Sequence, residues 1–289
     1  MIVSILLDNL TRKLGKPWLW SHALLVLAFL YGPILILILY SFNASRFDAV
    51  WTGFTLEWYQ ALLGKPSTIV TLDSAQVWSA LQNSLIVATI STCCATGLGT
   101  AVALALERFQ FPGQRLLEGA LFLPIIIPEI TLGIALLAFF SLIFQLLESL
   151  TGVRLVLGLP TVIISHITFS LAYVTLAVRT RLAEVDPRIE EAAMDLGANE
   201  WRTFTRIILP LIWPGILSGA LLAFTVSLDD FVIAFFTTGV GATTLPLFVY
   251  GMIKLSVSPM INALSSLTLL ASLLLVLCSL TLERSRRKS

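Results

Sequence analysis

The sequence predicts an all-α membrane protein with six transmembrane helices, and three observations support this fold class. Hydrophobic residues make up 57% of the 289 residues, and the mean hydropathy is +0.93, which is too apolar for a soluble domain of this length. The chain also contains apolar runs of about 20 residues, the length that crosses about 30 Å of hydrocarbon. Finally, Lys and Arg are distributed unevenly among the segments that join these runs.

The predicted spans lie within one domain, 1–289, and cover residues 23–42, 81–106, 116–144, 160–178, 214–238 and 262–282. The third span contains Pro124 and Pro128, so we expect it to be broken or kinked. His166 is the one ionisable residue of the fourth span. In the second span, small residues recur at every fourth position and indicate a ridge against which another helix packs: Ser91, Ala95, Gly99 and Ala103.

Basic residues predict the orientation, because Lys and Arg near the ends of spans are held on the cytoplasmic side. Six spans place both termini on one side, together with every Lys and Arg except Arg46, Lys65, Arg154 and Lys254. We therefore expect cytoplasmic termini. The basic tail "RSRRKS" is predicted to anchor the chain at that surface and not to bind nucleic acid.

The loop between the fourth and fifth spans, residues 179–213, is then the longest cytoplasmic loop. Asp186 and Pro187 resemble a helix start, and Gly197 is placed to end that helix. A second short helix is expected from about Asn199 toward Pro210. A small apolar surface is predicted amid the charges, formed by Ala192, Ala193, Met194 and Leu196.

The stretch "EEAAMDLGANEWRTFTRIILPLIWPG" resembles the EAA loop of permease subunits of binding-protein-dependent ABC importers. The matching residues, with the family's spacing, are Glu191, Ala192, Ala193, Gly197, Ile207, Leu209 and Pro210. The resemblance implies the type I ABC importer permease fold in a bacterial cytoplasmic (inner) membrane, with this loop docked on a cytoplasmic ATPase.

Further partners are implied by the same resemblance: a second homologous permease, two ATPase copies and an extracytoplasmic substrate-binding protein. ATP and Mg²⁺ are expected on the ATPase, since the phosphate-binding pattern G-x-x-x-x-G-K-[ST] is absent and both Gly-Lys pairs are followed by proline. No cofactor, metal site or catalytic residue is predicted for this chain.

Three acidic residues inside the predicted spans are candidates for the substrate pathway: Glu129, Asp229 and Asp230. Counting 1.5 Å per residue along straight helices places them at similar depth with no basic residue except His166 nearby, which suits a cationic substrate. The alternative is structural, with the aspartates capping a helix break or bonding neighbouring helices and Glu129 facing a second permease.

Two segments favour the first alternative by resemblance. "LPIIIPEITLGIALL" and "SLDDFVIAFFTTG" are similar to the second permease of spermidine/putrescine transporters, as is the outer stretch "WTGFTLEWYQALL". This implies a polyamine substrate. Two other classes are the alternatives: an importer of another solute (ferric iron, thiamine or an inorganic anion), and a membrane enzyme built on the paired aspartates. Trp51, Trp58 and Tyr59 of the outer stretch are expected either at the membrane interface or against a binding protein.

Overall fold

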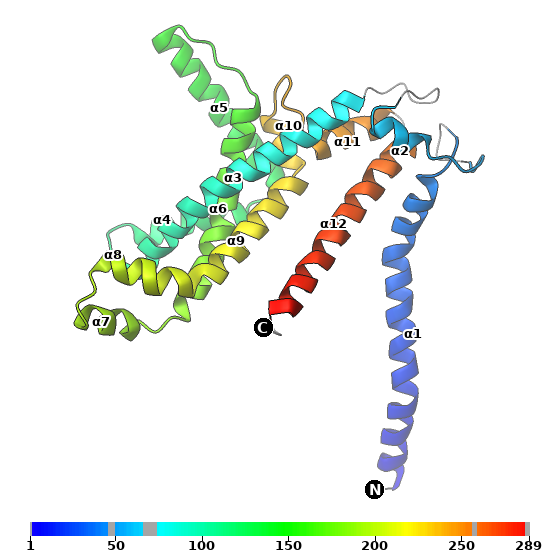
Figure 1. Cartoon of the computed structure of the whole chain (residues 1–289), viewed down its shortest axis with the longest axis horizontal. Helices are drawn as coiled ribbons and strands as arrows, with labels where there is room; N and C mark the ends of the chain where they lie inside the picture. The colour runs from blue at the N-terminus through cyan, green and yellow to red at the C-terminus, as the bar shows by residue number, and fades with distance from the viewer. Residues whose placement is uncertain (1, 46–49, 66–73, 256–258, 287–289) are drawn as a thin grey trace. The chain divides into compact units, whose positions relative to one another are not determined.

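The computed structural model describes residues 2–45, 50–65, 74–255 and 259–286, and within these ranges the secondary structure is helical apart from one isolated bridge between Asn43 and Phe54. Two compact units are present, Met1–Ser74 with Gly251–Ser289 (the terminal unit) and Ala75–Tyr250 (the central unit). Figure 1 labels the helices: α1 (Ile2–Tyr40), α2 (Glu57–Leu62), α3 (Ser74–Arg108), α4 (Gln114–Ile126), α5 (Glu129–Thr151), α6 (Leu159–Ala183), α7 (Arg188–Asp195), α8 (Glu200–Thr203), a π-helical turn η1 (Phe204–Ile208), α9 (Leu209–Asp229), α10 (Val232–Thr237), α11 (Leu245–Leu255) and α12 (Pro259–Arg286).

Membrane-spanning length and apolarity are found in five helical segments of the described chain: Pro17–Tyr40, Ala75–Arg108, Glu129–Thr151, Leu159–Ala183 and Glu200–Asp229. The predicted sixth span, 262–282, lies within helix α12, whose side chains are described only in part. The last residues of the basic tail, 287–289, lie outside the described residues.

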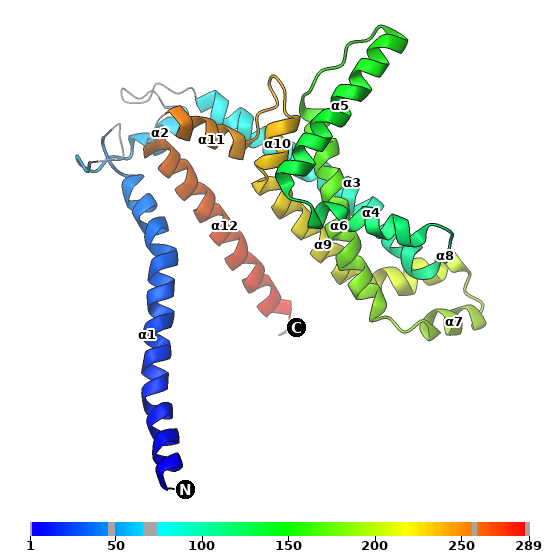
Figure 2. The same ribbon diagram turned by 180° about the vertical axis from the view of Figure 1, so that it is seen from behind.

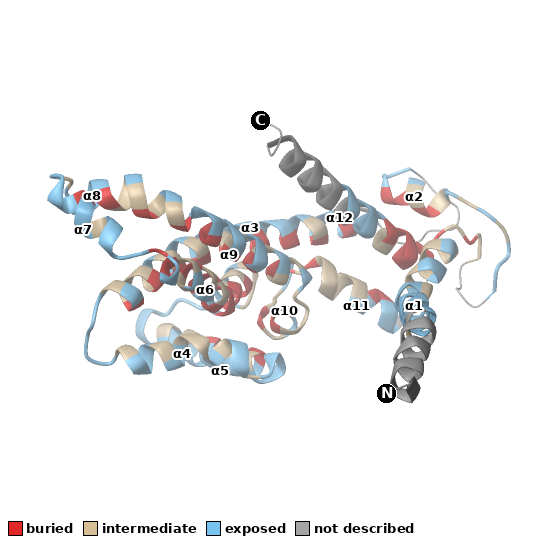
Figure 3. Cartoon of the chain, turned by 90° about the horizontal axis from the view of Figure 1, so that it is seen from below, coloured by how far each residue is buried: buried red, intermediate tan, exposed pale blue. Residues whose placement is uncertain are grey.

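In the terminal unit, aromatic side chains stabilise the segment between α1 and α2. The indole nitrogen of Trp58 donates to the backbone oxygen of Asn43 at 2.7 Å, and Trp58 is buried. The hydroxyl groups of Tyr59 and Ser41 lie 2.6 Å apart. Trp58 therefore packs inside its own unit, so neither role considered for it from the sequence is correct. By contrast, the apolar side chains described for α1 beyond Pro17 are largely exposed (Figure 3), as expected of a lipid-facing helix.

The centre of the second unit is formed by α6 and α9, which lie side by side in Figures 1 and 2. Gly215 and Gly219 of α9 permit this approach, because a Cβ at Gly219 would lie 3.1 Å from the Cα of Val174, and one at Gly215 would lie 2.6 Å from the Cβ of Arg181. Buried aliphatic side chains from α3, α6 and α9 complete this core, among them Ala95, Ala103, Val174, Val178, Ile212, Ile216 and Ala223.

The small-residue ridge predicted on the second span is confirmed. A Cβ at Gly99 would lie 2.9 Å from the side chain of Val174, and the Thr175 hydroxyl donates to the Gly99 carbonyl at 3.4 Å. Ala95 and Ala103 are fully buried. Small side chains on α3 therefore let α6 approach closely, which is the usual basis of helix association in a membrane.

The third predicted span, 116–144, is divided into α4 and α5, which confirms the expected break. Ile127 and Pro128 have extended backbones, with ψ values of 137° and 134°. Proline disfavours the helical conformation in the preceding residue, so Pro128 ends α4, whereas Pro124 remains inside that helix. Glu129 is consequently the first residue of α5.

Candidate functional site

The loop after α6, which is predicted to dock on the ATPase, contains a helix followed by a glycine turn. The carboxylate of Asp186 accepts a hydrogen bond from the Arg188 amide at 3.0 Å and Pro187 precedes the first helical residue of α7, as expected from the sequence. At the other end, the amide of Ala198 donates to the carbonyl of Ala193 and that of Gly197 to Met194. This pairing is the Schellman motif, and its left-handed residue is Gly197, with φ +87°.

The second helix of the segment differs from the prediction. It begins at the Asn199 cap, whose side chain accepts from the Arg202 amide at 2.8 Å. However, it does not end near Pro210; it continues through the π-helical turn η1 into α9 as one helix, Glu200–Asp229. Pro210 has no backbone N–H to donate, and the wider π turn before it lets the helix continue without that hydrogen bond. The loop is therefore shorter than the predicted 179–213, since α6 ends at Ala183 and the next long helix starts at Glu200.

The seven motif residues divide into a core-facing group and an exposed group. Ala193 is buried, and Ile207 and Leu209 pack on the aliphatic core. The exposed members are Glu191, Ala192, Gly197 and Pro210. The expected apolar surface is present, with Leu196 90% exposed and Met194 and Trp201 also exposed, but Ala193 is not part of it.

Ion pairs that were not foreseen from the sequence connect this segment to neighbouring helices. Arg108, at the end of α3, pairs with Glu190 of α7.

Helix α6 contributes two further arginines. Arg179 of α6 contacts Glu107 of α3 at 3.4 Å and Glu118 of α4 at 2.5 Å. The Arg181 guanidinium also donates to the Leu211 carbonyl of α9 at 3.1 Å. Charged side chains thus connect α3, α4, α6 and α7 beside the exposed loop.

The second predicted site lies where α9 ends. Asp229 is the last residue of α9 and is exposed, whereas Asp230 has an extended backbone with φ −66° and ψ 124°. The Asp230 carboxylate accepts hydrogen bonds from the amides of Ile233 at 3.3 Å and Ala234 at 2.9 Å. It therefore caps α10, in agreement with the structural alternative for this residue. The predicted fifth span, 214–238, is not one continuous helix.

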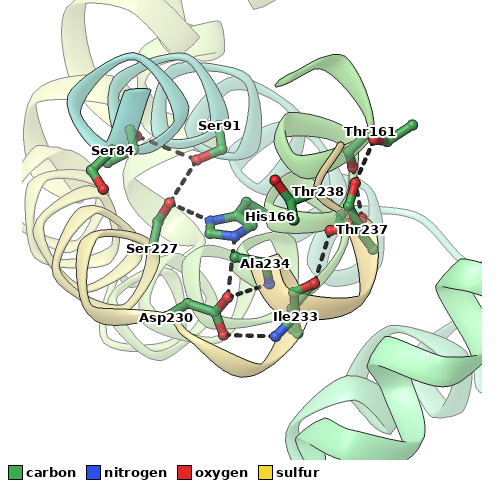
Figure 4. Close-up of polar contacts among 12 residues, drawn as sticks. Ser84, Ser91, Thr161, His166, Ser227, Asp230, Ile233, Ala234, Thr237 and Thr238 are labelled. Carbon is green, nitrogen blue, oxygen red and sulfur yellow. Dashed lines mark hydrogen bonds and ion pairs between the residues drawn. The ribbon is translucent and has the colours of Figure 1, made fainter. Parts of the chain in front are cut away.

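Asp230 also has a basic neighbour (Figure 4). Nε2 of His166 lies 3.3 Å from Oδ2 of Asp230, without the alignment of a hydrogen bond. Nδ1 of His166 lies 2.7 Å from Oγ of Ser227, which lies 3.1 Å from Oγ of Ser91. His166 is only 1% exposed, and its ring packs on Phe169. His166, the one basic residue that the depth count placed near the three acids, is therefore the neighbour of Asp230.

Glu129 stands apart from this cluster and is exposed at the first turn of α5, where a carboxylate interacts favourably with the positive end of the helix dipole. One turn later, Gly133 packs against Phe236; a Cβ there would meet the Phe236 ring at 2.5 Å. The helix that holds Glu129 is thus packed directly on α10. The depth predicted for Glu129 assumed one straight helix from residue 116, and that assumption is wrong because the chain breaks at 127–128.

Ser227, His166 and Asp230 include the residue types of a hydrolase triad, yet their arrangement does not suit nucleophilic catalysis. Oγ of Ser227 is already hydrogen-bonded to His166 and Ser91, and Ser227 is only 4% exposed inside the bundle. A nucleophile needs an open position for the reacting atom. Among the described residues, no group of three or more His, Cys, Asp or Glu side chains is placed to hold a metal ion. The cluster is structural.

Comparisons with known proteins agree with this picture. Residues 95–287 match the family model for the binding-protein-dependent transport system inner membrane component. The chain is 40% identical over 263 residues to the spermidine/putrescine transport system permease protein PotC of Escherichia coli strain K12, covering 91% of this chain and 92% of the relative. It is 42% identical over 255 residues to the putrescine transport system permease protein PotI of the same strain, covering 88% and 86%.

The fold is also found in solved structures. A chain in the crystal structure of a bacterial ABC transporter involved in the import of the acidic polysaccharide alginate matches with a TM-score of 0.73 at 19% identity, covering 96% of this chain and 98% of that chain. A second crystal structure, of a bacterial alginate ABC transporter in complex with a pentasaccharide-bound periplasmic protein, matches with a TM-score of 0.67 at 18% identity, covering 92% and 93%. The protein is a transport permease and not an enzyme. It belongs to the family of binding-protein-dependent transport system inner membrane components.

Proposed function

We propose that this chain is the permease subunit through which an ATP-driven importer moves polyamines, spermidine or putrescine, into the bacterial cytoplasm. The observation that carries the proposal is the presence of two exposed carboxylates, Glu129 and Asp229, at helix breaks within otherwise apolar membrane segments. Polyamines are the cargo named for the two relatives at 40% and 42% identity.

Charge complementarity supports a cationic cargo. An ionised side chain inside a membrane is costly, and such residues usually face a water-filled pathway or a partner. Asp229 and Glu129 each end or begin a helix beside a non-helical backbone, a feature that is tolerated at membrane depth where it lines a cavity or is covered by protein. A carboxylate forms strong charge-assisted hydrogen bonds with ammonium groups. An anionic cargo would instead be repelled there.

The exposed face of the loop that follows α6 is proposed to receive the ATPase. Leu196, Met194 and Trp201 form its apolar part, and Glu191 and Ala192 lie on the same short segment. Apolar and aromatic anchors surrounded by polar residues are typical of protein interfaces. On this proposal the loop and both termini are cytoplasmic, ATP and Mg²⁺ bind the ATPase dimer, and a second permease and an extracytoplasmic binding protein complete the importer.

Uptake by bacterial cells tests this proposal. Cells that lack other polyamine importers receive the ATPase, the second permease and the binding protein, with or without this chain, and accumulation of radiolabelled putrescine and spermidine is measured. We expect uptake only with the intact chain, and none with the Gly197→Asp variant. Uptake of ferric iron, thiamine or an inorganic anion in place of polyamine, by a complex shown to assemble, would overturn the cargo assignment and keep the importer.

A further inference from the structure

We infer that His166 is a positioning residue, which holds Asp230 as the cap of α10 and thereby fixes the helix break that carries Asp229. The inference rests on the proposed function in one respect: it assigns the cargo-facing role to Asp229 and removes it from Asp230. Ser227 and Ser91 extend the same chain of contacts to α9 and α3, so that three helices contribute to the position of one carboxylate.

The two aspartates have opposite surroundings although they are adjacent in the chain. Asp229 is exposed, whereas the Asp230 side chain is 5% exposed. Both oxygens of Asp230 are used, since Oδ1 accepts from the Ile233 amide and Oδ2 from the Ala234 amide while facing Nε2 of His166. A carboxylate with these partners is not free to bind an ammonium group. Its orientation instead determines where α10 begins and where Asp229 lies.

The imidazole itself has little freedom to move. It is buried, its ring centroid lies 5.2 Å from that of Phe169, and its Nδ1 is held by Ser227. With a proton on Nε2, the ring accepts from Ser227 and directs the positive end of its N–H dipole at the Asp230 carboxylate. The Ser227 hydroxyl then accepts from Ser91. Each hydroxyl in this chain then has an acceptor, as buried polar groups require, while Nε2 faces the Asp230 carboxylate at 3.3 Å without an aligned hydrogen bond.

Helix α6 holds α10 at both ends, which makes the arrangement more than a local cap. His166 contacts Asp230 before α10 starts, and the Thr161 hydroxyl donates to the Thr237 carbonyl at the last residue of α10, at 2.6 Å. The two α6 residues are five apart and bracket the six residues of α10 (Figure 4). A shift of α6 would therefore move the start of α10 and, with it, the position of Asp229.

Hydrogen exchange of the assembled transporter tests the positioning role without reference to cargo. We expect His166→Ala to raise the exchange rate of the Ile233 and Ala234 amides about fivefold, the factor that loss of a helix cap gives. Ser227→Ala should produce a smaller increase. His166→Gln, which retains an N–H donor, should remain near the wild-type rate, and Asp230→Asn, which retains one acceptor oxygen, should fall between the wild type and Asp230→Ala.

Matched controls lie two residues from His166 and two residues from Ser227. Thr168 of α6 and Thr225 of α9 are exposed, and within the described part of the chain they bond only to carbonyls one turn earlier in their own helices. Thr168→Ala and Thr225→Ala should therefore leave the Ile233 and Ala234 amides unchanged. Unchanged exchange in both His166→Ala and Ser227→Ala would overturn the inference. Equal acceleration in the threonine controls would do the same, because it would show general loosening of the bundle.

Polyamine uptake, normalised to the amount of assembled complex, separates positioning from stability alone. We expect His166→Ala to lower uptake per complex and His166→Gln to restore it. If exchange rises in His166→Ala while uptake per complex remains at the wild-type level, His166 stabilises the break without positioning a transport group, and the inference fails. If the wild-type complex imports no polyamine, the proposed cargo fails, and the exchange rates alone decide whether His166 holds Asp230.

Discussion

Single residues determine what the helix break after α9 can do. Asp229 and Asp230 are consecutive, but the change from helical to extended backbone between them directs one carboxylate to the outside and the other into the bundle. On a continuous helix the two side chains would differ only in direction. Here they differ in chemistry, since one is available to a cation and the other is engaged by backbone amides and His166.

Removing the charge of the exposed carboxylates is expected to impair transport without impairing assembly. Asp229→Asn should lower polyamine uptake about tenfold, the factor that corresponds to about 1.4 kcal/mol of lost charge pairing. Glu129→Gln should act in the same direction. Both rates are measured with labelled putrescine, and co-purification with the ATPase is the control. Normal uptake in both variants would make the two acids structural.

Gly197 offers a second prediction at this scale. Its φ of +87° is a conformation that side chains other than those of Asn and Asp rarely adopt, and no atom would lie within 4 Å of a Cβ added there. Gly197→Asp keeps the turn possible but adds a negative charge beside Leu196, so we expect loss of ATPase binding, measured by co-purification from detergent. Gly197→Asn carries the same shape without charge and should retain binding. Equal loss in both variants would point to the backbone instead.

Individual residues could be predicted from the sequence where a short local pattern determines them. The start of a helix near Asn199 and the turn at Gly197 follow from local chemistry alone, and both are present. The partner of Asp230 could not be predicted in this way, because His166 is 64 positions earlier and only the packing of α6 on α9 brings it near. An ionisable residue alone in an apolar span was the available signal.

At the scale of elements, ion pairs attach the exposed loop to the long helices. Arg108 and Glu190 connect the end of α3 to α7, and each side chain is roughly a quarter exposed. Partly exposed ion pairs contribute little to stability, about 0–1 kcal/mol. Their consequence here is geometric, because α7 is only eight residues long and its orientation depends on contacts outside itself.

Charge reversal tests this connection. Arg108→Glu places two negative side chains together, so we expect ATP hydrolysis to continue while uptake per ATP falls, with partial recovery in the exchanged pair Arg108→Glu with Glu190→Arg. Both quantities are measured in reconstituted complexes. Arg115→Glu is a suitable control, since Arg115 on the neighbouring α4 forms no ion pair with any of the described residues. Uptake per ATP at the wild-type level in Arg108→Glu would remove the pair from the coupling path.

Helix breaks mark the limit of what could be predicted for elements. The proline rule predicted the break before Glu129, and the structure confirms it. The break after Asp229 has no proline or glycine to indicate it, and it persists because Asp230 replaces backbone hydrogen bonds. Conversely, Pro210 predicted an end that does not occur, because the π turn accommodates it. Local propensity thus fails to predict helix ends in two situations. In one, a side chain accepts the hydrogen bonds of backbone amides; in the other, a π turn lets the helix continue past a proline.

The whole molecule has the fold of an importer permease, and much of its described surface is apolar. Many large apolar side chains of α1 and α5 are exposed, and lipid or a second permease would cover them. The fold class could be predicted from composition and span length. The cytoplasmic placement of the termini remains a prediction from the distribution of basic residues.

Transport by the purified complex tests the central claim most directly. Proteoliposomes that hold this chain with the second permease and the ATPase are given the loaded binding protein outside and ATP inside, and labelled spermidine and putrescine inside the vesicles are counted. We predict accumulation that requires ATP, the binding protein and Asp229 and that stops with Gly197→Asp. Accumulation that proceeds equally with Asp229→Asn and Glu129→Gln, or no polyamine accumulation by a complex that hydrolyses ATP, would contradict the account.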